Sequence, residues 1–168
     1  MATPLFTYDP SSVTCLVAGL LALDGFVDGS FITINKERQP YQSITTPDGT
    51  TARLHNEDSN YKVSITLHSG SSSNDFLTKL WLLDEVSERG KFPLLIKDGS
   101  GSDLFFSTTT WIEGVPEIIK SNGIDVRTWV LKAAFAVVNF GGNGEESDII
   151  NDLVSLAASA LPSISDLF

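Results

Sequence analysis

Hydrophobic and polar residues alternate in short runs over most of the chain, and this pattern predicts a protein built mainly of β-strands. In residues 61–68 (YKVSITLH), every second side chain from Tyr61 to Leu67 is apolar, so one face is packed and the other carries small polar residues. Other runs rich in β-branched and aromatic residues end at Gly, Pro or Asp-Gly turns, and they predict strands at residues 13–18, 31–37, 92–97, 104–112 and 128–138.

A repeat of three to four residues in residues 73–89 (SNDFLTKLWLLDEVSER) predicts one helix within the first 140 residues. Ser72 or Ser73 can cap its first amides, and Gly90 is expected to take the left-handed conformation after its last turn. A helix with a wide apolar side, including Leu83 and Val86, needs a sheet to cover it. The expected fold class is therefore mainly β (α+β), a β-sandwich or open barrel flanked by one helix.

Three segments are expected to extend from this sandwich. Residues 1–12 form a polar N-terminal arm, and residues 36–60 form a protruding hairpin that turns at Pro47-Asp48-Gly49. A glycine-rich hinge then leads to residues 147–161, whose pattern is that of an amphipathic helix. This C-terminal helix would either fold back on its own sandwich or dock on a neighbouring copy. We divide the chain into a β-sandwich domain, residues 1–140, and a hinge with a C-terminal helix, residues 141–168.

The formal net charge of −10, from 11 Lys and Arg against 21 Asp and Glu, disfavours a protein that grips nucleic-acid phosphates. The single cysteine, Cys15, excludes an internal disulfide and lies in an apolar strand, where it is expected to be inert. The apolar runs are too short to cross a bilayer, so no membrane association is expected.

Few residues suggest chemistry. His55 and His68 have no companion His or Cys at the spacing of metal ligands. The run from Asp98 to Asp103 lacks the glycine and the terminal acid that a calcium loop requires, and a hairpin turn explains it. We expect no catalytic residue, no metal and no cofactor. All three tryptophans, including Trp111, fall in apolar patterns and are expected in the core.

Several motifs, in this order along the chain, resemble tail tube proteins of contractile-tailed bacteriophages. They are residues 8–13 (YDPSSV), 25–33 (GFVDGSFIT), 73–75 (SND), 93–98 (PLLIKD) and 111–113 (WIE). The resemblance covers about residues 8–140, and the segment from Gly141 onward has no counterpart in it. Such proteins are similar in fold to the tube proteins of type VI secretion systems.

The resemblance implies a structural protein without enzymatic activity. Six copies would form a ring, and rings would stack into a hollow tube, inside a contractile sheath, through which DNA is ejected without specific binding. The expected partners are the sheath, tape measure, baseplate and tail terminator proteins. The expected location is the tail tube of a virion that is assembled in the host bacterial cytoplasm. The tube of a tailocin or another contractile injection system is an alternative. A soluble β-sandwich ligand-binding module, with exposed aromatic residues on one face, is an alternative from another class.

Three sets of residues follow from this interpretation. Candidate contacts between rings lie in the arm and the hairpin: Phe6, Tyr8, Lys36, Arg38, Tyr41, Asp48, Arg53 and His55. Candidate bore-lining residues lie on the polar side of one strand: Lys62, Ser64, Thr66 and His68. Lys62 suits a DNA channel poorly and is expected to pair with an acid of the next subunit. Candidate docking residues of the C-terminal helix are Ile149, Ile150, Leu153 and Leu156.

Overall fold

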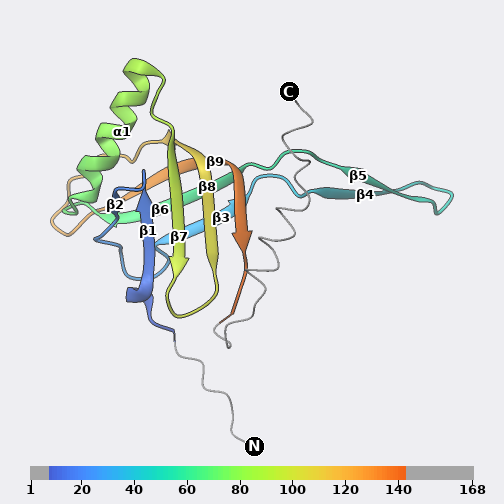
Figure 1. Ribbon diagram of the computed structural model, residues 1–168, viewed down its shortest axis with the longest axis horizontal. Helices are drawn as coiled ribbons and strands as arrows, with labels where there is room; N and C mark the ends of the chain where they lie inside the picture. The colour runs from blue at the N-terminus through green and yellow to red at the C-terminus, as the bar shows by residue number, and fades with distance from the viewer. Residues whose placement is uncertain (1–7, 143–168) are drawn as a thin grey trace, which may run out of the picture.

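The computed structural model describes residues 8–142 of the chain (Figure 1). Phe6 and the predicted C-terminal helix, with its candidate docking residues, therefore lie outside the described residues. After a short 3-10 turn at Pro10–Ser12, the elements are β1 (Val13–Val17), β2 (Leu21–Ala22), β3 (Ile32–Lys36), β4 (Tyr41–Thr45), β5 (Thr51–His55), β6 (Tyr61–His68), α1 (Ser73–Ser87), β7 (Phe92–Asp98), β8 (Leu104–Gly114) and β9 (Val126–Asn139).

Seven strands form one antiparallel sheet in the order β2-β1-β7-β8-β9-β6-β3. The sheet bends so strongly that its two halves cross: β1, β7 and the start of β8 lie over β9, β6 and β3 (Figure 1). The two longest strands, β8 and β9, pass from one half to the other. The expected mainly β fold, an open barrel with one flanking helix, is confirmed.

Irregular positions in the long strands allow this bend. The pairing of β8 with β9 shifts register between Ile112 and Gly114, and that of β7 with β8 shifts between Phe92 and Leu94. In β9, Phe135 has a φ of 53°, so the alternation of faces slips there and its ring points outward. Such bulges add local twist and bend a strand.

The core fills the space between the two halves of the sheet. In β6, the side chains of Val63, Ile65 and Leu67 are fully buried, as the alternation in the sequence predicted. They meet residues of the opposite half such as Leu94 and Phe105. Burial of each such side chain stabilises the fold by roughly 1.5–3 kcal/mol relative to exposure.

Helix α1 packs against the inner side of the sheet through a buried amide. Asn74 is the centre of this contact: its Nδ2 donates to the carbonyl oxygens of His68 (2.9 Å) and Ser71 (3.1 Å), and its Oδ1 accepts from Nε1 of Trp129 (2.9 Å). Leu77 is buried beside it. The helix is therefore fixed to strands β6 and β9 at its N-terminal end.

The C-terminal end of α1 differs from the prediction in three ways. The helix ends at Ser87, and Glu88 rather than Gly90 takes the left-handed conformation, with a φ of 57°. Gly90 is needed for close approach, because its N–H donates to Oδ1 of Asp84 and an added Cβ would lie 2.3 Å from the Asp84 Cβ. Leu83 and Val86, expected on the packed side, are exposed because this end of the helix extends beyond the sheet.

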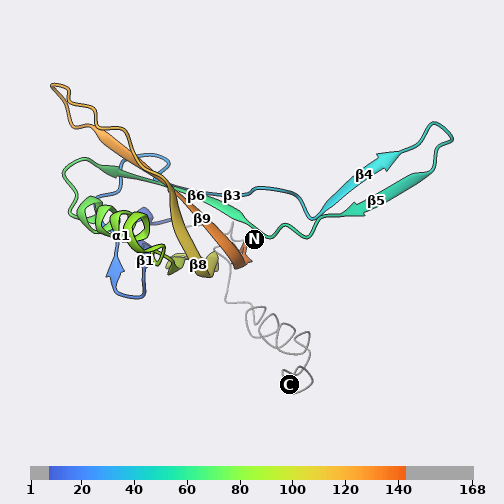
Figure 2. The ribbon, with the colours of Figure 1, turned by 90° about the horizontal axis from the view of Figure 1, so that it is seen from above.

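Strands β4 and β5 form a separate two-stranded hairpin in which every residue is exposed. Figure 2 shows it projecting away from the body beyond the ends of β3 and β6. Its turn is held by Asp48, whose carboxylate accepts from the Thr46 hydroxyl and from the Thr50 N–H (3.0 Å). The hairpin expected from the Pro47-Asp48-Gly49 turn is thus present. The domain boundary at residue 140 stays a prediction.

Candidate functional site

One outer face of the sheet is polar and open. It lies on the side of the sheet away from α1, because Trp129 of β9 points toward the helix while its neighbours in sequence point outward. It combines side chains from β3, β6, the first half of β9 and the end of β8. We call this set the polar face: Thr33, Asn35, Lys62, Ser64, Thr66, His68, Trp111, Glu113, Thr128, Val130 and Lys132.

Strand register brings the small polar side chains of this face together. Ser64 of β6 is opposite Thr33 of β3 on one side and Val130 of β9 on the other. The hydroxyls of Thr66 and Thr128, also opposite each other, are 3.1 Å apart. These short side chains on adjacent strands form an uncharged, hydroxyl-rich part of the polar face.

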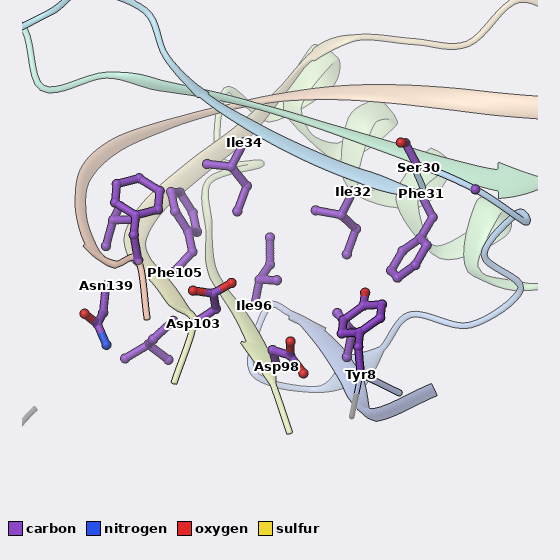
Figure 3. A pocket seen from close by; sticks show the side chains of 15 residues that line it. Tyr8, Ser30, Phe31, Ile32, Ile34, Ile96, Asp98, Asp103, Phe105 and Asn139 are labelled. Atoms are coloured by element: carbon purple, nitrogen blue, oxygen red, sulfur yellow. The ribbon is translucent and has the colours of Figure 1, made fainter. Parts of the chain in front are cut away.

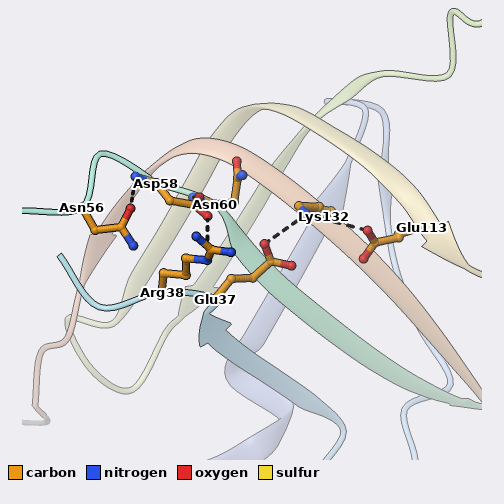
Figure 4. A network of polar contacts seen from close by, with 7 residues as sticks. All are labelled: Glu37, Arg38, Asn56, Asp58, Asn60, Glu113 and Lys132. Carbon is orange, nitrogen blue, oxygen red and sulfur yellow. Dashed lines mark hydrogen bonds and ion pairs between the residues drawn. The ribbon is translucent and has the colours of Figure 1, made fainter. Parts of the chain in front are cut away.

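The cations of the polar face are partly neutralised (Figure 4). The ammonium Nζ of Lys132 lies 3.0 Å from a carboxylate oxygen of Glu37 and 3.8 Å from one of Glu113. The hydrogen bond with Glu37 raises the pKa of Lys132. Lys62 lies opposite Lys132 in the register of β6 and β9 and has no carboxylate partner within the described residues. Its expected pairing with an acid of another subunit stays a prediction.

Two of the remaining polar-face residues need comment. Trp111 was predicted to lie in the core, and this prediction is wrong: the residue lies opposite Lys132 on the outer face and is half-buried. In β8 the buried positions change from odd-numbered residues (Ser107) to even-numbered ones (Thr110) where the pairing with β7 shifts, and this change places Trp111 on the outer face. His68 lies at the end of β6, and its Nδ1 is shielded without a hydrogen-bond partner among the described residues.

The hairpin β4–β5 brings together several residues predicted to contact another ring. The Tyr41 ring contacts two residues of β5: the Arg53 guanidinium lies 3.3 Å from its centre, and the centre of the His55 ring lies 5.2 Å from it. Arg38 lies at the base of the hairpin, 3.8 Å from the Asp58 carboxylate. At the tip, hydrogen bonds from Thr46 and Thr50 lower the pKa of Asp48. These cation–π and capping contacts make an exposed hairpin locally ordered.

Two other residues that were predicted to contact an adjacent ring of subunits lie on the body rather than on the hairpin. Lys36 of β3 turns inward, with its ammonium 5.3 Å from the centre of the Tyr61 ring. Tyr8 lines a cavity of about 400 Å³ between β3 and the far half of the sheet. The structure does not bring these two residues together with the hairpin set.

The cavity beside Tyr8 marks the place where the barrel stays open (Figure 3). Its wall is mostly apolar, with Ile32 and Ile34 from β3 facing Ile96 and Phe105. Asp98 at its rim accepts hydrogen bonds from the hydroxyls of Ser12 (3.1 Å) and Ser100 (2.7 Å), and the bonds from Ser100 lower its pKa. These bonds hold the 3-10 turn before β1 against the β7–β8 turn.

Exposed apolar side chains gather at both ends of the body. The connector between β8 and β9, residues 115–125, exposes Val115, Ile118, Ile119 and Ile124. At the other end, the outer side of β8 and β9 exposes an aromatic end patch that we define as Phe106, Phe135 and Val137. Figures 1 and 2 place the connector opposite to the hairpin β4–β5, whereas the second half of β9 lies on the hairpin side. Sequence patterns gave no sign of either set.

Chemistry-bearing groups are dispersed within the described residues. No group of three or more His, Cys, Asp or Glu could hold a metal ion there. Cys15 is buried, and burial raises the pKa of its thiol to about 12. Helix α1, the one helix longer than a single turn in residues 8–142, is not long and apolar enough to span a membrane.

The fold is that of subunits found in virus-like particles. A chain from the virion of a native gene transfer agent particle has a TM-score of 0.56 and 9% identity, and the match covers 79% of this chain and 99% of that one. A chain of the tube-terminating cap of the anti-feeding prophage has a TM-score of 0.52 and 12% identity, covering 83% and 95%. No model of a known protein family matches the sequence.

Sequence similarity gives the narrower assignment. The chain is 31% identical over 162 residues to structural protein ORF10 of Pseudomonas phage KPP10, and the match covers 92% of this chain and 94% of that protein. The chain therefore belongs to the family of this phage structural protein. Members of this family are structural components rather than enzymes, as the sequence predicted.

Proposed function

We propose that this protein is the subunit of a phage tail tube, and that six copies form a ring whose polar faces line the bore. The observation that carries the proposal is the polar face itself: an open, hydroxyl-rich surface on four adjacent strands, lying on the side opposite to the only packed helix of the described chain. Lys62, Ser64, Thr66 and His68 of β6 belong to this surface.

The charge of the polar face suits the passage of DNA. Each Lys or Arg that pairs with a phosphate releases counterions and binds the duplex, so a channel for rapid passage needs few free cations. Lys132 is held by Glu37 and Glu113, and the serine and threonine side chains further along the polar face are neutral. Lys62, opposite Lys132, is the one cation of this face that has no carboxylate partner within the described residues. The excess of acids over bases in the whole chain keeps the surrounding potential negative.

Ring stacking is supported by the two ends of the body. The hairpin β4–β5 projects from one end with exposed Tyr41, Ile44 and Leu54, beyond the reach of its own sheet. The same end carries the aromatic end patch, and the opposite end carries the apolar connector. Contiguous exposed apolar residues mark sites of association. A head-to-tail contact between unlike surfaces repeats without closing, which produces a filament. The stacked tube would lie inside a contractile sheath and serve DNA ejection.

Electron microscopy of the purified full-length protein tests the proposal. Negatively stained samples, imaged over a range of protein concentrations, should contain rings with a central hole and hollow rods of the same diameter. A second sample mixed with chemically cross-linked rings as nuclei allows for a subunit that polymerises slowly. Solid fibres, or single globular particles in both samples, would contradict a tube subunit.

A further inference from the structure

The cavity beside Tyr8 is larger than the voids that a finished protein core contains. Interiors hold few voids larger than a water molecule, whereas about 400 Å³ is the volume of roughly a dozen waters in the liquid. Ile32 and Ile34 of β3 line it and are only half-buried, with Ile96 facing them (Figure 3). A wall of this kind offers water few hydrogen-bond partners, so apolar side chains are the better occupant.

The described chain ends at the margin of this cavity. Asn139, near the end of β9, lines the cavity together with Asp103, and Figure 3 shows both at its margin. The next residues are fastened to the turn between β7 and β8. The Gly141 N–H donates to Oδ1 of Asp103 (2.7 Å), and the Gly142 carbonyl accepts from the Ser102 N–H (3.2 Å). Whatever follows Gly142 therefore starts beside the opening.

The sequence that follows has apolar residues at the spacing of a helix. In residues 147–161 they recur at three- and four-residue steps, which places one group on a single side: Ile149, Ile150, Leu153, Leu156, Ala157 and Ala160. No Lys or Arg occurs in residues 143–168, so this segment has no cation to pair with Asp98 or Asp103 at the cavity rim. Burial of apolar surface is the interaction that would hold it there.

We propose that residues 147–161 form a helix that covers this cavity in the same chain, with Ile149, Leu153 and Leu156 directed into it. The inference is independent of the proposed function, because it concerns a contact within one subunit. Residues 143–146 let Ser147 lie up to roughly 17 Å from Gly142, which is enough because the chain already touches the cavity margin. A tether this short gives the segment an effective concentration on the order of 1 mM at its own cavity, which favours the same chain over a neighbouring copy.

Disulfide trapping in the full-length protein tests the contact directly. Ile34→Cys places a thiol on the wall of the cavity. It is combined in turn with Ile149→Cys, Leu153→Cys and Leu156→Cys, and each double variant is oxidised in dilute solution. We expect at least one pair to form an intramolecular disulfide, seen as a faster-migrating monomer on a non-reducing gel. Native Cys15 is fully buried, and burial raises the pKa of its thiol to about 12, so it should not compete.

Matched variants control both sides of the contact. Ala158 lies on the opposite side of the predicted helix, so Ile34→Cys with Ala158→Cys should stay reduced. Val138 lines the cavity and its neighbour Val137 is exposed on the outer side, so Val137→Cys with Leu153→Cys should also stay reduced. Equal cross-linking in these control pairs would overturn the proposal.

The other results of the trapping experiment are equally decisive. Disulfide-linked dimers in place of the intramolecular bond would assign the segment to a neighbouring copy and overturn the proposal. The absence of an intramolecular disulfide from all three cavity pairs would also overturn it.

Binding of an apolar dye identifies the occupant without any cross-link. In dilute full-length protein, Leu153→Ser combined with Leu156→Ser should uncover the cavity and raise the fluorescence of added ANS several-fold, whereas Ala158→Ser should match wild type. Phe6→Ser tests the rival occupant, because the N-terminal arm leads to Tyr8 at the cavity. Unchanged fluorescence in the double serine variant, or an increase in Phe6→Ser alone, would contradict the proposal.

Discussion

At the scale of single residues, the contact that positions α1 depends on one buried amide. Asn74 satisfies two carbonyl oxygens and one indole N–H, so both ends of its side chain are used. The sequence placed Asn74 at the start of a helix next to a possible cap, but gave no sign that its partner would be Trp129, 55 residues later. Partners so distant in the chain are fixed by the tertiary fold, which residue spacing alone does not reveal.

Two buried hydroxyls of β8 provide a matched prediction about stability. The Thr110 hydroxyl is fully buried without a partner among the described residues, whereas that of Ser107 donates to the Ala134 carbonyl (2.7 Å). Thr110→Val keeps the shape and removes an unpaired polar atom, so it should raise the free energy of unfolding by about 1 kcal/mol. Ser107→Ala should lower it by about 1–2 kcal/mol, because the Ala134 carbonyl loses its donor.

Urea denaturation of the two variants, followed by tryptophan fluorescence in monomeric samples, measures both changes. Equal destabilisation by Thr110→Val and Ser107→Ala would show that the Thr110 hydroxyl has a partner in solution.

At the scale of elements, the sequence predicted the strands and the helix because their patterns are local. Alternation in residues 61–68 and the three-to-four repeat in residues 73–87 each reflect burial of one side of a single element. The failures occur where one element meets another. Leu83 and Val86 have helical spacing but lie beyond the sheet. Trp111 lies on the outer face because the alternation of buried positions in β8 shifts between Ser107 and Thr110, where the pairing with β7 is irregular.

The sequence pointed to candidate assembly residues only where they belong to a recognisable turn or to an alternating strand. The turn residues Pro47-Asp48-Gly49 predicted the hairpin, and the alternation of apolar and polar residues predicted β6. No such signal marks the apolar connector or the aromatic end patch in the sequence. Phe135 and Val137 lie in a strand whose apolar pattern is typical of the core, and the bulge at Phe135 turns them outward.

Removal of the hairpin should separate folding from tube formation. The Asn56 N–H donates to the Pro40 carbonyl (2.8 Å), so residues 41–55 can be replaced by the two-residue turn Asn-Gly that closes such a pair. All ten strand residues of the hairpin are exposed, so the melting temperature of the monomer should change by only about 2–4 °C. We expect this variant to form rings but no tubes when observed by electron microscopy.

The wild-type chain, prepared in parallel, is the control for ring and tube yield. Tubes of ordinary length from the shortened chain would mean that the hairpin does not join rings.

At the scale of the whole molecule, the fold is a curled sheet with unpaired edge strands and an open cavity. Apolar side chains are also exposed at both ends of the body. A monomer with so many unpaired surfaces is better explained as one part of a larger wall than as a finished sandwich. The proposed tube function gives the negative net charge and the hydroxyl-rich polar face a common explanation, because DNA would have to pass this wall without binding to it.

A positive charge placed in the bore should make the tube retain DNA. Ser64→Lys adds one free cation per subunit to the centre of the polar face, where Ser64 is flanked by Thr33 and Val130. Assembled Ser64→Lys tubes should retain about tenfold more labelled duplex than wild-type tubes at low salt, and should release it as salt rises. Co-sedimentation of tubes with the duplex measures retention.

Ser64→Gln, of similar length without the charge, is the control and should behave as wild type. Equal retention by Ser64→Lys and Ser64→Gln tubes would place Ser64 away from the path of DNA.

The most direct test of the account is a cryo-electron microscopy map of the assembled full-length protein at a resolution that separates strands. We predict a hollow tube in which β3, β6, β9 and the end of β8 form the innermost wall, with Ser64 and Thr128 directed at the axis and α1 outside it. A tube whose bore is lined by α1 or by the β1–β7 half of the sheet, or an assembly without a bore, would contradict it.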